Sequence, residues 1–282
     1  MERLFATHFA QRASRIMGRM AGARLPAPIL KPLINAYALG MGVSMQDTEE
    51  PEGGFKTFGD FFGRRLRPGA RPICEDLDAV VSPCDGEILD FGAIGSDPNA
   101  TFFIKGSRYD MKSLIGDDTG STYRDGGYLV IYLHPRDYHR VHVPVDSRLL
   151  GVRHIPGTRY PVNSWANDKV EQIYGKNERV VFHLALPSGE EFVVVMVSAF
   201  GVGNIDSRFR FGSSWDPRVS RERYFDPPSK LMRGEELGAF LLGSTVVMIW
   251  SEGVFELDDA LVQGSATAMG RRLGRNKNGT TG

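Results

Sequence analysis

Three short stretches of the sequence carry side chains suited to acid–base or nucleophilic chemistry. They are SPCDGEI, with Asp85, LHPRDYHRVHVPVD, with His139 and His142, and LLGSTVVMIW, in which Gly243 and Ser244 precede a run of strand-forming residues. In a catalytic triad an imidazole takes the proton of a hydroxyl, and a carboxylate orients the imidazole. Asp85, His142 and Ser244 therefore form a candidate triad, although chain order alone does not establish one.

Each stretch also has an interpretation without catalysis. Asp-Gly is a common hairpin turn, and a glycine next to a strand often marks a bend or a close backbone approach. Three of the six histidines lie in the second stretch, which suggests metal binding or acid–base work. If RVHVPV is extended, His139 and His142 point to opposite faces, so two separate roles are favoured over a shared ion. We expect no metal site.

The composition is that of an ordinary globular protein of 282 residues. Lys plus Arg and Asp plus Glu balance at 34 each, so the net charge gives no indication of nucleic-acid binding. Cys74 and Cys84 match neither a zinc-ligand spacing nor a disulfide framework. No apolar run reaches the roughly 18 residues of a transmembrane helix, and we expect no secretory signal.

Residues 1–45 have a helical pattern and are strongly basic. A helical wheel places apolar side chains on one face and arginines on its flank: Phe5, Phe9, Ile16, Met20, Arg12, Arg15 and Arg19. Such an amphipathic helix could pack on its own domain or lie in a membrane interface. Pro26, Pro28 and Pro32 are expected to end it, and INAYALGMGVSM predicts a second short helix.

After a loop, DTEEPEGG, the pattern becomes that of strands. Short apolar runs occupy 128–133, 179–186, 191–200 and 245–250. Because few long helical stretches separate them, antiparallel pairing is favoured over parallel crossovers. The sequence thus predicts an α+β fold, in which a β-rich, mainly antiparallel catalytic domain (46–282) follows N-terminal amphipathic helices. The closing stretch GRRLGRNKNGTTG is expected to be a disordered tail.

From about residue 55 to 250 the chain resembles the phosphatidylserine decarboxylases. The resemblance depends on motifs in the right order: FFGRRLRPGARPI, SPCDGEI, HPRDYHRVHVP, PVNSWANDKVEQIYGKNERVV, VSAFGVGNI and RGEELGAFLLGST. The sequence departs from the family at Cys84, where a small apolar residue is usual, and in a distinctive connection over 209–230. This connection leaves the substrate details open.

The resemblance implies that the chain cuts itself between Gly243 and Ser244. His142, oriented by Asp85, would take the proton of Ser244, whose hydroxyl attacks the Gly243 carbonyl. The products would be chains 1–243 and 244–282, the second beginning with a pyruvoyl group, the only implied cofactor. A Schiff base between this group and phosphatidylserine would allow loss of CO₂ and give phosphatidylethanolamine. His139 would be the proton donor to carbon.

The same resemblance favours a peripheral membrane protein on the cytoplasmic face of the cell membrane. Its implied partners are phosphatidylserine, an anionic membrane surface, its own small chain and a second copy in a homodimer. Four arginines could hold phosphate or merely tie down a turn: Arg64, Arg65, Arg67 and Arg71. The alternatives are a pyruvoyl decarboxylase of a soluble amino acid, a lipid-binding relative that no longer matures, and a serine hydrolase, which lacks its GxSxG motif here.

Overall fold

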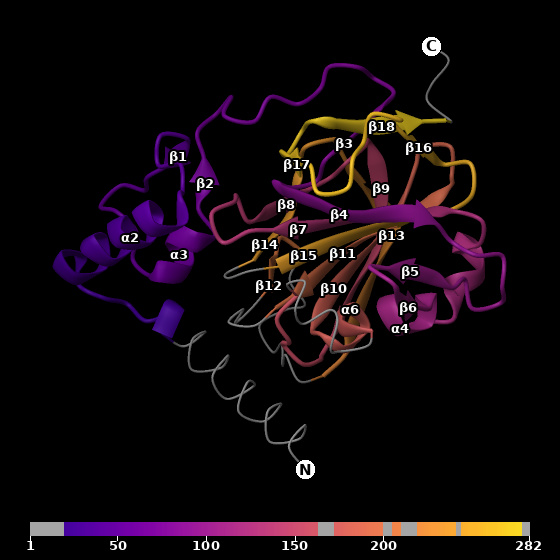
Figure 1. The fold of residues 1–282 in the computed structure, drawn as a ribbon, viewed down its shortest axis with the longest axis horizontal. Helices are drawn as coiled ribbons and strands as arrows, with labels where there is room; N and C mark the ends of the chain where they lie inside the picture. Colours follow the sequence, from indigo (N-terminus) through magenta and orange to yellow (C-terminus); the bar gives the residue numbers. More distant parts are fainter. Residues whose placement is uncertain (1–19, 163–171, 200–204, 210–218, 241–243, 278–282) are drawn as a thin grey trace.

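An eight-stranded antiparallel sheet forms the centre of the protein. The computed structural model describes residues 20–162, 172–199, 205–209, 219–240 and 244–277 (Figure 1). In spatial order the strands of this sheet are β13 (Arg221–Leu231), β9 (Ser147–Ile155), β10 (Arg179–Ala185), β11 (Glu191–Ser198), β15 (Ser244–Trp250), β7 (Gly127–Leu133), β4 (Gly86–Ala93) and β17 (Ala266–Thr267). The four predicted strands correspond to β7, β10, β11 and β15, and the predicted β-rich antiparallel fold is confirmed.

Both faces of the middle of this sheet are covered, which explains why β7, β11 and β15 are largely apolar runs. Alternate residues of β7 belong to two separate cores: Leu129 and Ile131 face one, Tyr128 and Val130 the other. An antiparallel sheet with one solvated face would instead show alternating polar residues. The runs are therefore a consequence of burial on two sides.

Two small sheets pack over the first face. They are β12 (Ile205–Ser207), β14 (Glu236–Phe240) and β8 (Arg140–His142) in one sheet, and β16 (Phe255–Leu257), β18 (Arg272–Asn276) and β3 (Ala79–Val81) in the other. The second face is covered by short elements: β5 (Phe102–Ile104), β6 (Ser107–Tyr109), α4 (Met111–Ile115), η1 (Thr119–Tyr123) and α6 (Ile173–Lys176).

A helical region lies to one side of the sheets (Figure 1). It contains α2 (Ala27–Met41), α3 (Phe58–Phe62) and the strand pair β1 (Thr48–Glu49) and β2 (Arg65–Leu66). Leu30, Ile34 and Ala38 of α2 form a small core with Phe61 of α3. Within the described ranges, no helix combines the length and apolar character needed to cross a bilayer. The basic helix expected in the first 20 residues lies almost wholly outside the described residues.

Two local predictions are wrong. Pro32 does not end a helix, because α2 continues through it. Pro32 lacks only the N–H that would bond to the Pro28 carbonyl, and the buried stripe of α2 holds the helix. The closing stretch is not a tail over 272–276, because these residues form β18, which pairs with β3 and β16 and buries Leu273.

Gly86 begins β4 where the backbones of β4 and β7 approach closely. A Cβ atom at this position would lie 2.4 Å from the carbonyl oxygen of Tyr132. The glycine after Asp85 is therefore needed for the contact between two strands. This contact fixes the start of β4 and, with it, the position of the Asp85 backbone.

Candidate active site

Ser244 is the first residue of the central strand β15. Its backbone pairs with Leu133 of β7 on one side and Ser198 of β11 on the other. The side chain is fully buried, and its Oγ has no hydrogen-bond partner among the described residues. A hydroxyl that is removed from water and unpaired is costly to keep, so Ser244 is a candidate nucleophile whose Oγ is not held by any described residue. Gly243 lies outside the described residues.

His142 lies in β8 opposite Glu236 of β14. Its Nδ1 is 2.8 Å from the carbonyl oxygen of Gly234, and because a carbonyl can only accept, Nδ1 carries the proton. Nε2 is then the acceptor for the hydroxyl of Tyr138, at 3.0 Å. Burial lowers the pKa of His142. The ring is thus held neutral, with the lone pair of Nε2 occupied by Tyr138.

His139 immediately precedes β8 and is fully buried. Its Nδ1 donates to the carbonyl of Asp137 at 2.8 Å, and its Nε2 has no partner among the described residues. The ring of Phe62 packs against it with 4.1 Å between ring centroids. Burial lowers the pKa of His139 to about 3. At neutral pH this side chain therefore offers a free lone pair and can accept a proton before it can donate one.

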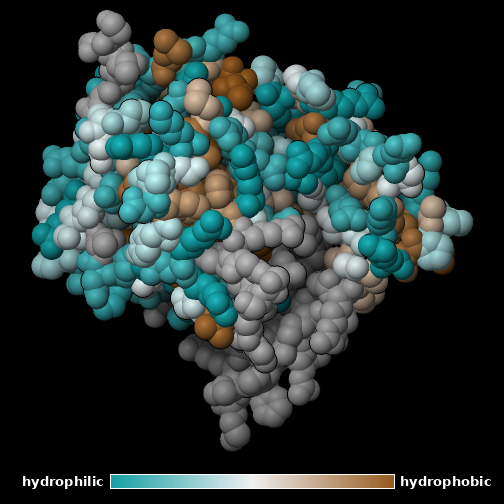
Figure 2. Space-filling model, turned by 180° about the vertical axis from the view of Figure 1, so that it is seen from behind, coloured by the Kyte–Doolittle hydropathy of each residue, from teal (hydrophilic) through white to brown (hydrophobic). Residues whose placement is uncertain are grey.

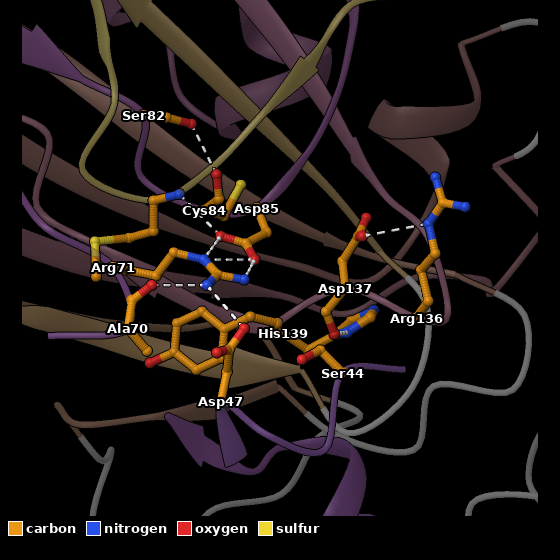
Figure 3. Close-up of polar contacts among 12 residues, drawn as sticks. Ser44, Asp47, Ala70, Arg71, Ser82, Cys84, Asp85, Arg136, Asp137 and His139 are labelled. Atoms are coloured by element: carbon orange, nitrogen blue, oxygen red, sulfur yellow. Dashed lines mark hydrogen bonds and ion pairs between the residues drawn. The ribbon is translucent and has the colours of Figure 1, made fainter. Parts of the chain in front are cut away.

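Asp85 follows β3 and is held by an arginine. The Nε of Arg71 lies 3.0 Å from both carboxylate oxygens and its Nη2 2.6 Å from Oδ2 (Figure 3). The backbone N–H of Met269 donates to Oδ1 at 2.9 Å. Arg71 also reaches Asp47 at 3.5 Å. The carboxylate is therefore fixed from the helical region on one side and from the segment after β17 on the other.

The structure brings the segment of Asp85 to β8, because the His142 N–H donates to the Pro83 carbonyl at 2.8 Å, and it ties His139 to the end of β14 through the Phe240 N–H. The recorded backbone partners of Ser244 are Leu133 and Ser198. No hydrogen bond joins any two of Asp85, His142 and Ser244, all three of which lie within the described residues. Their alignment as a triad stays a prediction. Sequence reasoning missed Tyr138 as the partner of His142, although it lies within the same DYHRVH motif.

The four arginines of the FFGRRLRPGAR stretch have different environments. Arg67 Nε donates to the Thr48 carbonyl at 3.2 Å and Arg71 holds Asp85, so both tie down their surroundings. Arg65 is 66% exposed and 3.9 Å from Glu236. Arg64 is buried, and its Nη2 donates to the carbonyls of residues 136 and 137. Over the described residues, no three potential metal ligands lie together.

Comparison with known proteins agrees with this architecture. The model of the phosphatidylserine decarboxylase family matches residues 58–275. Among similar proteins, the phosphatidylserine decarboxylase proenzyme of Methylibium petroleiphilum is 37% identical over 269 residues, covering 93% of each chain. The proenzymes of Acidovorax ebreus and an Anaeromyxobacter species are 37% and 32% identical, covering 87% and 93% of each chain. The chain thus matches, over most of its length, proteins named as proenzymes. The chain belongs to the phosphatidylserine decarboxylase family.

Proposed function

We propose that this protein decarboxylates phosphatidylserine to phosphatidylethanolamine, using a pyruvoyl group made from its own Ser244. The observation that carries the proposal is the place of Ser244: its buried hydroxyl stands directly after Gly243 in the LGST motif, at the start of β15. Ser198, opposite on β11, also has a buried hydroxyl without a partner among the described residues, so burial alone does not distinguish Ser244. Ser244 also lies inside the segment that matches the family.

Self-cleavage requires a base for the Ser244 hydroxyl. In the proposed reaction Oγ attacks the carbonyl carbon of Gly243, the C–N bond breaks, and the proton passes to the released amine. The ester then loses the Cα proton and the Cβ–O bond, and water converts the resulting dehydroalanine to the pyruvoyl group and ammonia. Nε2 of His142 is suited to take the first proton because Nδ1 is held protonated by Gly234. To do so it must exchange Tyr138 for Ser244.

Once formed, the pyruvoyl carbonyl supplies an electron sink for the amine-bearing carbon of the substrate. His139 is the candidate for the accompanying proton movements. Its Nε2 is unprotonated at pH 7, so it must gain a proton during the reaction before it can give one to the carbon that loses CO₂. The lowered pKa makes neutral His139 a weak base and its protonated form a strong acid, which suits the donation of a proton to carbon.

The proposed products of cleavage, 1–243 and 244–282, would remain together. The second chain would contribute β15, in the middle of the central sheet, as well as β17 and β18. Its Met269 N–H also binds Asp85. Separation would therefore break two long strand interfaces and expose both cores.

We further propose that residues 1–45 dock on an anionic membrane, which makes the protein peripheral on the cytoplasmic face. Hydrophobic side chains reach the surface of the helical region (Figure 2). Those of residues 20–41 that are exposed are Met20, Ile29, Leu33, Leu39 and Met41. Exposed apolar groups of this kind gain free energy on entering a lipid interface. The homodimer stays a prediction.

Intact-mass measurement of the purified protein tests the cleavage directly. Wild type should give two chains, with the smaller one lacking a free amino terminus, whereas Ser244→Ala should give one. Ser198→Ala is a matched control, because Ser198 is also buried with an unpaired hydroxyl directly opposite Ser244, and it should still cleave. An uncleaved wild-type chain with full decarboxylase activity would refute the proposal.

A further inference from the structure

Arg64 has a buried guanidinium group, and not all of its hydrogen-bond donors are used. Its residue is only 4% exposed, and Nη2 alone is used, by the carbonyls of residues 136 and 137 at 3.1 and 3.2 Å. Nε and Nη1 have no hydrogen-bond partner among the described residues. Burying unpaired donors of a charged group is strongly unfavourable. An anion that binds these donors would remove this unfavourable free energy.

The guanidinium lies beside the histidine proposed to move protons. The carbonyl oxygen of Asp137 accepts from Arg64 Nη2 at 3.2 Å and from His139 Nδ1 at 2.8 Å. Helix α3 supports both groups, since the Phe61 ring lies 5.4 Å from the Arg64 guanidinium carbon and the Phe62 ring packs on His139. An anion bound to Arg64 would therefore sit close to His139.

A cavity of about 490 Å³ lies where the helical region meets β8 and β14, and Arg64 is among its lining residues. This size is adequate for a lipid headgroup. The charged residues that line it are mixed: Lys56, Arg64, Arg65, Arg140, Glu49, Glu52, Asp60 and Asp206. Arg140 is paired with Glu236, and Arg64 is the only buried cation among these lining residues, so it is the candidate to recognise an anion here.

We propose that Arg64 anchors the phosphodiester of the substrate headgroup, an assignment that rests on the proposed function. Phosphatidylserine offers two anions, its carboxylate and its phosphate. The carboxylate leaves as neutral CO₂, so a cation bound to it would stabilise the substrate more than the transition state and slow the reaction. The phosphodiester keeps its charge throughout and suits the guanidinium donors. Arg64 is therefore a specificity-determining residue for substrates that carry this phosphate.

Binding can be measured without turnover. We would titrate glycerophosphoethanolamine into the mature protein and follow it by ³¹P NMR, comparing Arg64→Gln and Arg64→Lys with Arg275→Gln. Arg275 is the control because it is 59% exposed, pairs with Glu256 and does not line the cavity. Arg64→Gln should weaken binding by about 10- to 100-fold, the usual effect of losing hydrogen bonds to a charged group. Arg64→Lys should lie between, and Arg275→Gln should match wild type.

Kinetics with two soluble substrates separates phosphate anchoring from a structural role. For glycerophosphoserine, Arg64→Gln should raise KM by a similar factor and change kcat little. O-methylserine, which lacks phosphate, should be processed equally by wild type and variant. Unchanged glycerophosphoethanolamine binding in Arg64→Gln, or an equal loss on both substrates, would overturn the inference.

Two further outcomes are decided by the same measurements. If Arg64→Gln does not fold, the wild-type protein alone tests the inference. Its kcat/KM should be at least about tenfold higher for glycerophosphoserine than for O-methylserine. Equal kcat/KM values for the two substrates would overturn the inference. If wild type stays uncleaved and inactive, the proposed function fails, while the ³¹P titration still reports whether Arg64 binds a phosphodiester.

Discussion

Replacing His139 should make the folded protein less sensitive to acid, because this histidine is buried in its neutral form. Burial lowers the pKa of His139 from the ordinary 6.5 to about 3. The unfolded chain therefore takes up a proton at this residue over a pH range in which the folded chain does not. Protonation in this range favours the unfolded state.

The sign and size of the effect follow from linkage. The contribution of neutral His139 to stability is fully present above pH 6.5 and is lost as the pH falls towards 3. Each pKa unit corresponds to about 1.4 kcal/mol, so the whole shift amounts to roughly 5 kcal/mol. At about pH 4.5, about 3 kcal/mol of the free energy of unfolding should have been lost through this residue.

Urea unfolding at about pH 7.5 and about pH 4.5 measures this loss. The Ser244→Ala chain is the suitable parent, since as a single chain it avoids dissociation of two products. His139→Gln and His139→Met in this background should each lose about 3 kcal/mol less than the parent between the two pH values. The two replacements differ in polarity, so their agreement would separate the titration from a change in packing.

Burial also lowers the pKa of His142 and of His183. Both residues are present in parent and variants, so their contributions cancel in the comparison. If parent and variants lose stability in parallel on acidification, His139 is not a buried neutral group. Its proposed role as the first proton acceptor would then lose its basis.

Two other predictions concern positioning and docking. Arg71→Gln should slow self-cleavage at least about tenfold because Asp85 loses its main partner. Arg71→Lys should cleave at an intermediate rate, and the control Arg67→Gln should cleave like wild type. Time courses of intact mass measure these rates, and cleavage of Arg71→Gln at the wild-type rate would contradict the prediction. Deleting residues 1–24, or replacing Leu39 (88% exposed) with Asp, should weaken sedimentation with anionic vesicles and leave cleavage intact. Leu77→Asp, at an 83% exposed leucine before β3, is the control, and unchanged sedimentation of both altered proteins would refute docking.

The strands of the central sheet were predictable because their signal is local. The strands β7, β10, β11 and β15 are rich in apolar residues, broken in β10 only by His183 after its first residue Arg179, and such runs are visible without knowing what covers them. The errors at Pro32 and at 272–276 have the opposite cause. Local composition disfavoured a helix in one place and a strand in the other, and tertiary packing outweighed it through the buried residues of α2 and through Leu273.

The sequence alone therefore determined the candidate catalytic residues and the family to which the chain belongs, because motifs preserve residue type and order. Only the tertiary structure decided the partners of those residues. Arg71 holds Asp85, Tyr138 binds His142, and two donor nitrogens of Arg64 find no partner in the part of the chain that the structure describes. Burial and contacts with distant segments set the protonation state of a side chain and decide which of its donors lack a partner. These properties cannot be read from the order of residues along the chain.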